Sequence, residues 1–151
     1  MPTKKIRTCL WFDRQAEEAA RFYVSLFPDA AIEKIVPSPD GTPLLVEFQI
    51  RGTFLIALNG GPHFQLNEAV SLSVDCETQS EIDELWERLC EGGAPSQCGW
   101  LTDRFGLSWQ IVPSILPSLM SDPRRAEKIM AVMMPMKKLD IGKIRAAAES
   151  V

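Results

Sequence analysis

The sequence predicts an α+β fold that consists of two βαβββ modules followed by a helical C-terminal arm. Two observations lead to this prediction. The order strand, helix and three further strands occurs twice, at roughly residues 1–60 and 68–113, and such self-similarity is informative about a fold before residue details are considered. After Pro113 the pattern changes to short helices that prolines interrupt. The 151 residues have the usual length of one domain and can bury a core.

The first module begins with a short, apolar and β-prone run at residues 6–12. A helix is predicted within residues 14–27, because alanine and larger apolar residues recur there at helical spacing. Asp13 is the expected N-cap of this helix, since its side-chain oxygen can accept a hydrogen bond from the first turn. Pro28 is expected to end the helix.

Three strands complete the first module. Residues 30–36 alternate between apolar and polar side chains, and the turn-rich stretch PSPDGTP separates them from the next strand. Residues 44–50 and 53–58 are predicted to form a hairpin, because Arg51-Gly52 is the short glycine-containing link typical of one.

The second module repeats this order. Residues 69–76 alternate as a strand, and a helix follows in which Thr78 is the expected N-cap and Glu81 its capping-box partner. The pair Gly92-Gly93 is expected to end this helix. The stretches PSQCGWLTD and LSWQIVP, with a turn at RFG between them, provide the remaining strands.

The C-terminal arm is predicted to form short helices that Pro117, Pro123 and Pro135 interrupt. Its methionines cluster at near-helical spacing, at Met130, Met133, Met134 and Met136. Met-rich faces can hold flexible ligands, but they fill a core or a subunit interface more often. We therefore expect the arm to pack across the two modules or onto a second subunit.

Composition excludes several classes of partner. The formal net charge of −4 and the pI near 5.1 argue against nucleic acid and anionic membranes, which select basic surfaces. No apolar run reaches the roughly 18 residues of a membrane span, and no signal peptide is evident at the N-terminus. The four cysteines show no CxxC spacing and no paired framework, so we expect reduced thiols and a cytoplasmic protein.

Several stretches carry a resemblance to a known family. LWFDRQAEEAARFYVSLFP, ALNGGPHF, CETQSEIDELWERL, QCGWLTDRFGLSWQIVP and MKKLDI are similar to the PhnB-like branch of the vicinal oxygen chelate superfamily, which includes glyoxalase I and bleomycin resistance proteins. The resemblance implies one glyoxalase/bleomycin resistance-like domain over residues 1–151, with module one at 1–62, module two at 68–113 and the arm at 114–151. It also implies a curved mixed sheet around a cleft, and a homodimer.

Members of this branch often bear the name 3-demethylubiquinone-9 3-methyltransferase. A doubly wound methyltransferase needs a glycine-rich turn that lets the backbone approach its nucleotide cofactor. The nine glycines include no G-x-G pattern, and the predicted antiparallel-rich repeat is a different architecture. We therefore interpret the methyltransferase name as a misnomer and expect no cofactor.

The resemblance also implies where a metal would bind, at inward-facing His, Gln or Glu residues on the first and last strands of each module. Gln110 occupies the usual glutamate position in the motif DRFGLSWQ, which begins at Asp103. The other matching positions hold poor ligands: Ala69 in module two, Ile6 or Thr8 in the first strand, and Leu55, Ala57 or Asn59 in the fourth. A single neutral amide does not compensate a divalent ion for the loss of its hydration shell, so we expect no bound metal.

Without a metal, aromatic and amide side chains are the candidates for a ligand-binding wall. The expected ligand-binding residues are Trp11, Tyr23, Asn59, His63, Phe64, Cys98, Trp100 and Gln110. Among them, Gln110 and Asn59 would hydrogen-bond the polar part of a ligand. Phe22 and Trp109 are expected in the core, where aromatic residues usually lie.

Few titratable residues could perform chemistry. His63, the single histidine, is the best candidate for a catalytic base, because imidazole titrates near neutral pH. A structural or solvated role in the GGPHF turn is the alternative. Cys98 could be a nucleophile only with His63 or a cation nearby, so an unreactive thiol is the default expectation. Glu47 alternates with apolar neighbours in its strand, and we expect it to face solvent.

Three functions are compatible with these expectations. The first is metal-free binding of a small molecule whose identity the sequence does not specify. The second is a metal-dependent lyase, isomerase or dioxygenase that uses Gln110 and unrecognised further ligands. The third is a protein that acts through its dimer surface without a ligand. Whether the chain is an enzyme is open at this point.

Overall fold

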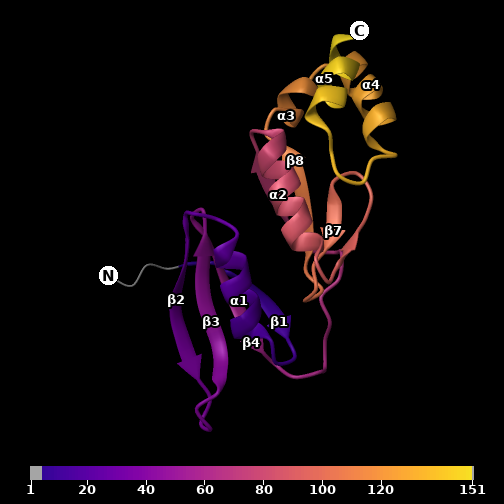
Figure 1. The fold of residues 1–151 in the computed structure, drawn as a ribbon. Helices are drawn as coiled ribbons and strands as arrows, with labels where there is room; N and C mark the ends of the chain where they lie inside the picture. The colour runs from indigo at the N-terminus through magenta and orange to yellow at the C-terminus, as the bar shows by residue number, and fades with distance from the viewer. Residues whose placement is uncertain (1–4, 151) are drawn as a thin grey trace. The chain divides into compact units, whose positions relative to one another are not determined.

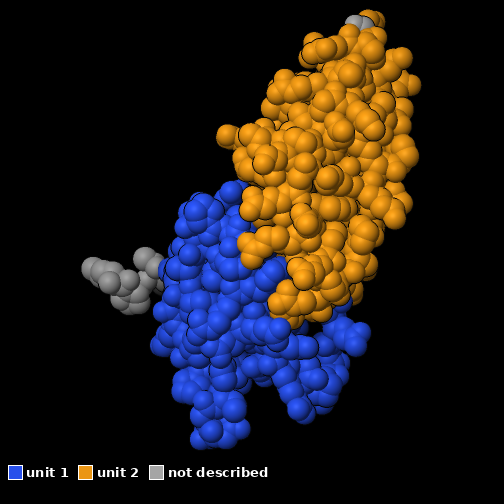
Figure 2. Space-filling view, viewed as in Figure 1, with its two compact units in different colours: residues 1–66 blue, residues 67–151 orange. Residues whose placement is uncertain are grey.

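The computed structural model describes residues 5–150 and divides into two compact units, one up to residue 66 and one from residue 67 onward (Figures 1 and 2). Each unit contains one four-stranded sheet and the helix that follows its first strand. The two predicted βαβββ modules are therefore confirmed, and each unit is described by itself below.

Unit 1 has the predicted element order. Its elements are β1 (Thr8–Phe12), α1 (Ala16–Ser25), β2 (Ala30–Pro37), β3 (Pro43–Ile50) and β4 (Thr53–Asn59). The strands lie in the order β1-β4-β3-β2, with β1 parallel to β4 and the other pairs antiparallel. The predicted β3–β4 hairpin is confirmed: Arg51 and Gly52 have φ values of 49° and 81°, as a two-residue turn between twisted strands requires.

Helix α1 is capped by a distant residue. The prediction that Asp13 caps it is wrong, because Gln15 occupies the N-cap position and makes no side-chain capping hydrogen bond. Instead, Asn59 Oδ1 at the end of β4 accepts a 2.8 Å hydrogen bond from the backbone N–H of Ala16. Asn59 Nδ2 donates to the carbonyl of Pro43 at 2.9 Å. Both polar atoms of this amide thus join secondary-structure elements.

The core of unit 1 lies between α1 and one face of the sheet (Figure 1). Three alanines of α1 are fully buried, at Ala16, Ala19 and Ala20. Their small side chains let the helix approach the sheet closely. Tyr23 is also fully buried, and the centroid of its ring lies 6.2 Å from that of Phe48 on β3.

The first part of unit 2 repeats the topology of unit 1. Its elements are β5 (Ser71–Cys76), α2 (Gln79–Cys90), β6 (Ala94–Pro95), β7 (Trp100–Thr102) and β8 (Ser108–Pro113). The strand order is β5-β8-β7-β6, with β5 parallel to β8. The predicted N-cap of α2 is confirmed, because Thr78 Oγ1 accepts a 3.1 Å hydrogen bond from the backbone N–H of Glu81.

A buried carboxylate holds the turn between β7 and β8. Asp103 is only 3% exposed, and its Oδ1 accepts hydrogen bonds from the backbone N–H groups of Phe105 and Leu107 at 2.8 and 3.1 Å. Its Oδ2 accepts a 2.9 Å hydrogen bond from Trp109 Nε1. Trp109 is fully buried, as expected. The acidic residue of the DRFGLSWQ motif therefore builds this turn and satisfies a core tryptophan.

The predicted helical arm is confirmed. It contains α3 (Leu116–Leu119), α4 (Pro123–Met133) and α5 (Ile141–Glu149). Its buried cluster consists of Ile129, Met133, Leu139, Ile144, Ala147 and Ala148. Val112 of β8 and Cys98 in the turn before β7 pack against this cluster, so the arm is part of unit 2. The methionines of the arm have different roles: Met133 is buried in this core, whereas Met134 is 53% exposed.

The stretch that connects α4 to α5, residues 136–141, is hydrogen-bonded on two sides. The carbonyls of Met136 and Lys137 accept from the backbone N–H groups of Cys98 and Gly99 at 2.6 and 2.8 Å. On the other side, the Gln79 amide of α2 donates to the carbonyl of Leu139 at 3.0 Å. The same amide accepts from the backbone N–H of Ile141 at 2.8 Å. We call residues 136–141 the strap.

Candidate functional site

The two sheets present different chemistry on the face opposite their helix. In unit 1 the paired positions Trp11, Leu58 and Leu45 form a half-buried row across three strands. Beside it, Glu47 pairs across the strands with Ile56. Arg7 Nη1 lies 2.8 Å from Glu47 Oε1, so this carboxylate is ion-paired and half-buried, whereas the sequence predicted solvation. This face is mainly apolar.

Trp11 organises the loop that follows β4. Its indole Nε1 donates a 2.9 Å hydrogen bond to the carbonyl of Gly61. The indole lies so close to Gly60 that a Cβ on Gly60 would be 2.3 Å from the ring, so only glycine fits there. The ring of Phe64 meets Trp11 edge-on with 4.9 Å between ring centroids, yet Phe64 is 66% exposed. Two predicted ligand-binding aromatics therefore lie together.

The other predicted residues of unit 1 lie in different settings. His63 is exposed in the turn after β4 and forms no hydrogen bond or ion pair with any residue in 5–150. A general base that nothing orients is poorly prepared for proton transfer. Tyr23 lies in the core against Phe48, and both amide atoms of Asn59 hold backbone.

In unit 2 the face opposite α2 is polar. Ser71, Ser108 and Thr102 are paired neighbours on β5, β8 and β7, and paired residues point to the same side of a sheet. They therefore form a row of three hydroxyls. The adjacent row consists of Ser73, Gln110 and Trp100 on the same strands. Trp109 and Ile111, which alternate with these residues on β8, point to the side that α2 covers.

One hydroxyl in this row has no partner. Ser108 is 1% exposed, and its Oγ is the single buried side-chain N or O atom without a hydrogen bond in the part of the chain that is described. Its neighbour Ser71 differs, because Ser71 Oγ accepts a 3.0 Å hydrogen bond from Gln110 Nε2. Leaving a buried hydroxyl unpaired costs about 1–3 kcal/mol. Such groups in native proteins call for a specific explanation.

Cys98 lies next to this face in an unusual backbone conformation. Its φ of 58° is left-handed, and its backbone N–H donates to the strap at Met136. Burial raises the pKa of the Cys98 thiol, which disfavours the nucleophilic thiolate. The turn formed by Cys98 and Gly99 leads directly into the half-buried Trp100. Cys98 is therefore placed to shape the loop, and its thiol is not activated.

The superfamily fold implies a metal, but the residues present do not fit one. No group of three or more His, Cys, Asp or Glu side chains among residues 5–150 could hold a metal ion. The amide of Gln110 donates to Ser71, and its cross-strand neighbours Ser73 and Trp100 are neither imidazole, thiolate nor carboxylate. Structural and catalytic divalent ions rely on those three ligand types. No reaction step through a metal is derived for this site.

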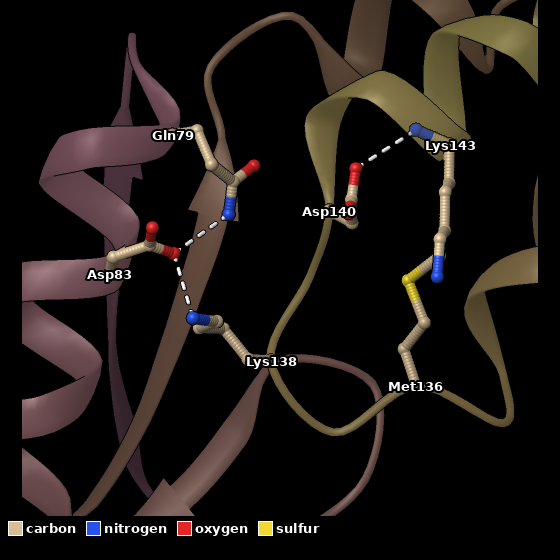
Figure 3. Close-up of a pocket in the computed structure, with 6 residues that line it drawn as sticks. All are labelled: Gln79, Asp83, Met136, Lys138, Asp140 and Lys143. Carbon is tan, nitrogen blue, oxygen red and sulfur yellow. Dashed lines mark hydrogen bonds and ion pairs between the residues drawn. The ribbon is translucent and has the colours of Figure 1, made fainter.

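A pocket of about 270 Å³ lies elsewhere in unit 2, between α2 and the arm (Figure 3). Its lining residues are Gln79, Asp83, Met136, Lys138, Asp140 and Lys143. Sequence reasoning missed this pocket, because its two walls are about sixty residues apart in the chain and neither contains a recognisable site motif. It also missed the hydroxyl row, whose trace in the sequence is the alternation of polar residues in SLS and SWQ.

The comparisons with known proteins identify the family. The model of the 3-demethylubiquinone-9 3-methyltransferase family matches residues 4–112. A Bacillus cereus PhnB protein described by the same methyltransferase name is 33% identical, with a TM-score of 0.68 over 73% of this chain and 99% of that one. A Pseudomonas aeruginosa protein is 20% identical, with a TM-score of 0.60 over 72% and 96%. No curated protein matches the chain significantly.

More distant similarity concerns the fold alone. The fosfomycin resistance protein FosX from Listeria monocytogenes, solved with Mn(II) and sulfate, is 15% identical with a TM-score of 0.52 over 74% of this chain and 92% of that one. Within residues 5–150 no helix is long and apolar enough to cross a membrane. With its two βαβββ sheets the chain has the vicinal oxygen chelate fold, and it belongs to the PhnB-type family that bears the name 3-demethylubiquinone-9 3-methyltransferase.

Proposed function

We propose that this protein binds a small molecule without a metal, and that the polar face of unit 2 contacts the polar part of that molecule. The unpartnered hydroxyl of Ser108 carries the proposal. An orphaned buried hydroxyl destabilises the free protein, and a ligand that supplies its hydrogen-bond partner recovers that free energy on binding. Gln110 offers its Oε1 beside it, since Nε2 is the atom that donates to Ser71.

Aromatic side chains would bury the apolar part of the ligand. Trp100 lies in the row beside Ser108 and is half-buried. Within unit 1, Trp11 and the exposed Phe64 form a separate aromatic surface with His63 in the same loop, which we propose as a ligand contact of that unit by itself. Of the two amides predicted to bind, Gln110 is the better candidate, because Asn59 would have to release α1 and β3 to reach a ligand. Tyr23 and Cys98 would act by supporting the neighbouring backbone.

We further propose that residues 1–151 act as one domain, as a homodimer, in a reducing compartment such as the cytoplasm. The same strand order occurs in both units and the family match at residues 4–112 spans both, which favours function of the whole chain over that of either unit. All four cysteines lie in the described residues and are free thiols. The exposed Met134 of the arm favours a subunit contact.

Methyl transfer is not the activity that we propose. Neither sheet is doubly wound, since each has four strands and one parallel pair. The nucleotide-binding turn of such enzymes follows a parallel strand and contains a G-x-G pattern, which the sequence lacks. We therefore propose that the family name does not describe the chemistry of this chain.

A small-molecule screen by thermal shift, carried out in the presence of a chelator, tests the proposal. A ligand that binds the native state raises the Tm by mass action. Ser108→Ala removes the buried unpaired hydroxyl, so the free variant should be at least as stable as the wild type, by up to roughly 1–3 kcal/mol. The same variant should lose most of the ligand-induced shift in Tm.

The matched control is Ser114→Ala, because Ser114 is an exposed serine of the same unit. This control should respond to ligand as the wild type does. If Ser108→Ala is less stable than the wild type and responds normally to every ligand found, the hydroxyl is structural and the proposed site is wrong.

A further inference from the structure

The pocket between α2 and the arm has two walls with different electrostatics (Figure 3). On the α2 wall, Asp83 Oδ1 accepts from Gln79 Nε2 at 2.9 Å and lies 2.8 Å from Lys138 Nζ. Lys138 lowers the pKa of the Asp83 carboxyl, mainly through this hydrogen bond. The charges on this wall therefore neutralise each other, and Oδ2 of Asp83 accepts no hydrogen bond from a residue in 5–150.

On the arm wall, two opposite charges are not paired with each other. Asp140 is the N-cap of α5, and its Oδ1 accepts from the backbone N–H of Lys143 at 3.0 Å. The ammonium of Lys143 has no hydrogen bond or ion pair with any residue that the structure describes. Figure 3 shows the Lys143 side chain running beside that of Met136 along this wall. The Asp140 carboxylate and the Lys143 ammonium thus both line the pocket and can form further hydrogen bonds with a ligand.

The balance of charge restricts the class of ligand. Because Asp83 and Lys138 neutralise each other, Asp140 and Lys143 are the charges that remain for a ligand. A simple anion would be attracted by Lys143 and repelled by Asp140, and a simple cation would experience the reverse. A molecule with adjacent ammonium and carboxylate groups can match Asp140 and Lys143 at once. The volume of about 270 Å³ equals that of roughly nine liquid water molecules, which suits a compact molecule.

We propose that this pocket binds a small zwitterion of the α-amino-acid type, with the ligand carboxylate on Lys143, its ammonium on Asp140 and its side chain along Met136. This site is separate from the polar face of unit 2, and the proposal does not rest on the function proposed for that face. The arm wall lies beyond residue 112, where the family match ends, so the two charges that would hold the ligand come from outside the matched region.

Calorimetric titration of the full chain with three matched probes tests the ligand class. L-norleucine carries both charges, hexanoate lacks the ammonium and pentylamine lacks the carboxylate. Because a charge-assisted hydrogen bond contributes about 1.5–3 kcal/mol, each single-charge probe should bind at least about tenfold more weakly than norleucine. Equal binding by hexanoate would overturn the proposal in favour of an anion site, and no binding by norleucine would overturn it outright.

Two variants locate the site. Lys143→Met removes the ammonium and leaves the backbone N–H that Asp140 caps, so it should weaken norleucine binding by about tenfold. The control is Arg145→Met, because Arg145 is an exposed cation of the same helix that does not line the pocket. Circular dichroism checks that both variants fold.

Norleucine should also slow hydrogen exchange at Cys98 and Gly99, whose N–H groups bond to the strap. Unchanged exchange there together with unchanged binding by Lys143→Met would contradict the placement.

Discussion

At the scale of the residue, single polar side chains hold several backbone segments of this protein through hydrogen bonds. Asn59 joins the starts of α1 and β3, Gln79 joins α2 to the strap, and Asp103 holds the β7–β8 turn. Each of these side chains hydrogen-bonds backbone N–H or C=O groups, whose burial without a partner would cost free energy. The sequence could not predict the role of Asn59, because its partners Ala16 and Pro43 lie 43 and 16 residues away along the chain.

The Asp83–Lys138 ion pair predicts a pH dependence of stability. Lys138 lowers the folded-state pKa of Asp83, so the pair stabilises the fold above the unfolded-state pKa of about 3.9. This contribution is lost as the pH falls through the lower folded-state pKa. Both side chains are more than a third exposed, so Asp83→Asn should lower the free energy of unfolding by only about 0.2–1 kcal/mol at neutral pH.

Urea denaturation at a series of pH values checks this expectation. The difference between the wild type and Asp83→Asn should shrink toward zero in acid, while Glu127→Gln, an exposed carboxylate of α4, serves as the control. A difference that is constant down to the acid limit would show that Asp83 acts through hydrogen bonding alone.

At the scale of the element, the strap packs closely against Gly99. Gly99 has a φ of 84°, and a Cβ there would lie 2.9 Å from Leu139 Cδ1 and 3.0 Å from the carbonyl oxygen of Ile111. Gly99→Ala therefore combines a left-handed backbone cost of about 1–2 kcal/mol with an overpacking cost of about 1–3 kcal/mol. It should destabilise the protein and expose the Cys98 amide to hydrogen exchange.

Gly41→Ala is the matched control for this substitution. Gly41 has a similar φ of 87°, but a Cβ there would meet no atom within 4 Å. Denaturant unfolding should therefore give a larger loss for Gly99→Ala than for Gly41→Ala, and the excess measures the packing of the strap. Equal losses in the two variants would mean that the strap yields freely to the added methyl group.

Element patterns that depend on local chemistry were predictable from the sequence. The repeat, the Arg51-Gly52 hairpin and the Thr78 cap each depend on residues close together in the chain, and the structure confirms them. Pro123 was expected to interrupt a helix, but it occupies the first turn of α4, where a missing N–H costs nothing. The cap of α1 and the strap depend on hydrogen bonds between residues far apart in the chain, which the periodicity of the sequence does not reveal.

At the scale of the whole molecule, duplicated topology supports two chemically different sheets. The central strand β4 presents Ile56 and Leu58 on the face opposite α1, whereas β8 presents Ser108 and Gln110 opposite α2. The sequence pointed to Gln110 and Trp100, and register brings these two residues together as cross-strand neighbours. It could not reveal the orphaned Ser108 hydroxyl, because whether a serine has a partner depends on packing that no local pattern records.

Elemental analysis of the full chain, purified without chelator and without added metal, tests the metal-free assignment most directly. The donor set around Gln110 predicts far less than one equivalent of zinc, manganese, iron or nickel per chain, and no difference between the wild type and Gln110→Ala. One equivalent of a divalent ion that Gln110→Ala removes would contradict the account and make a metal-dependent enzyme the better description.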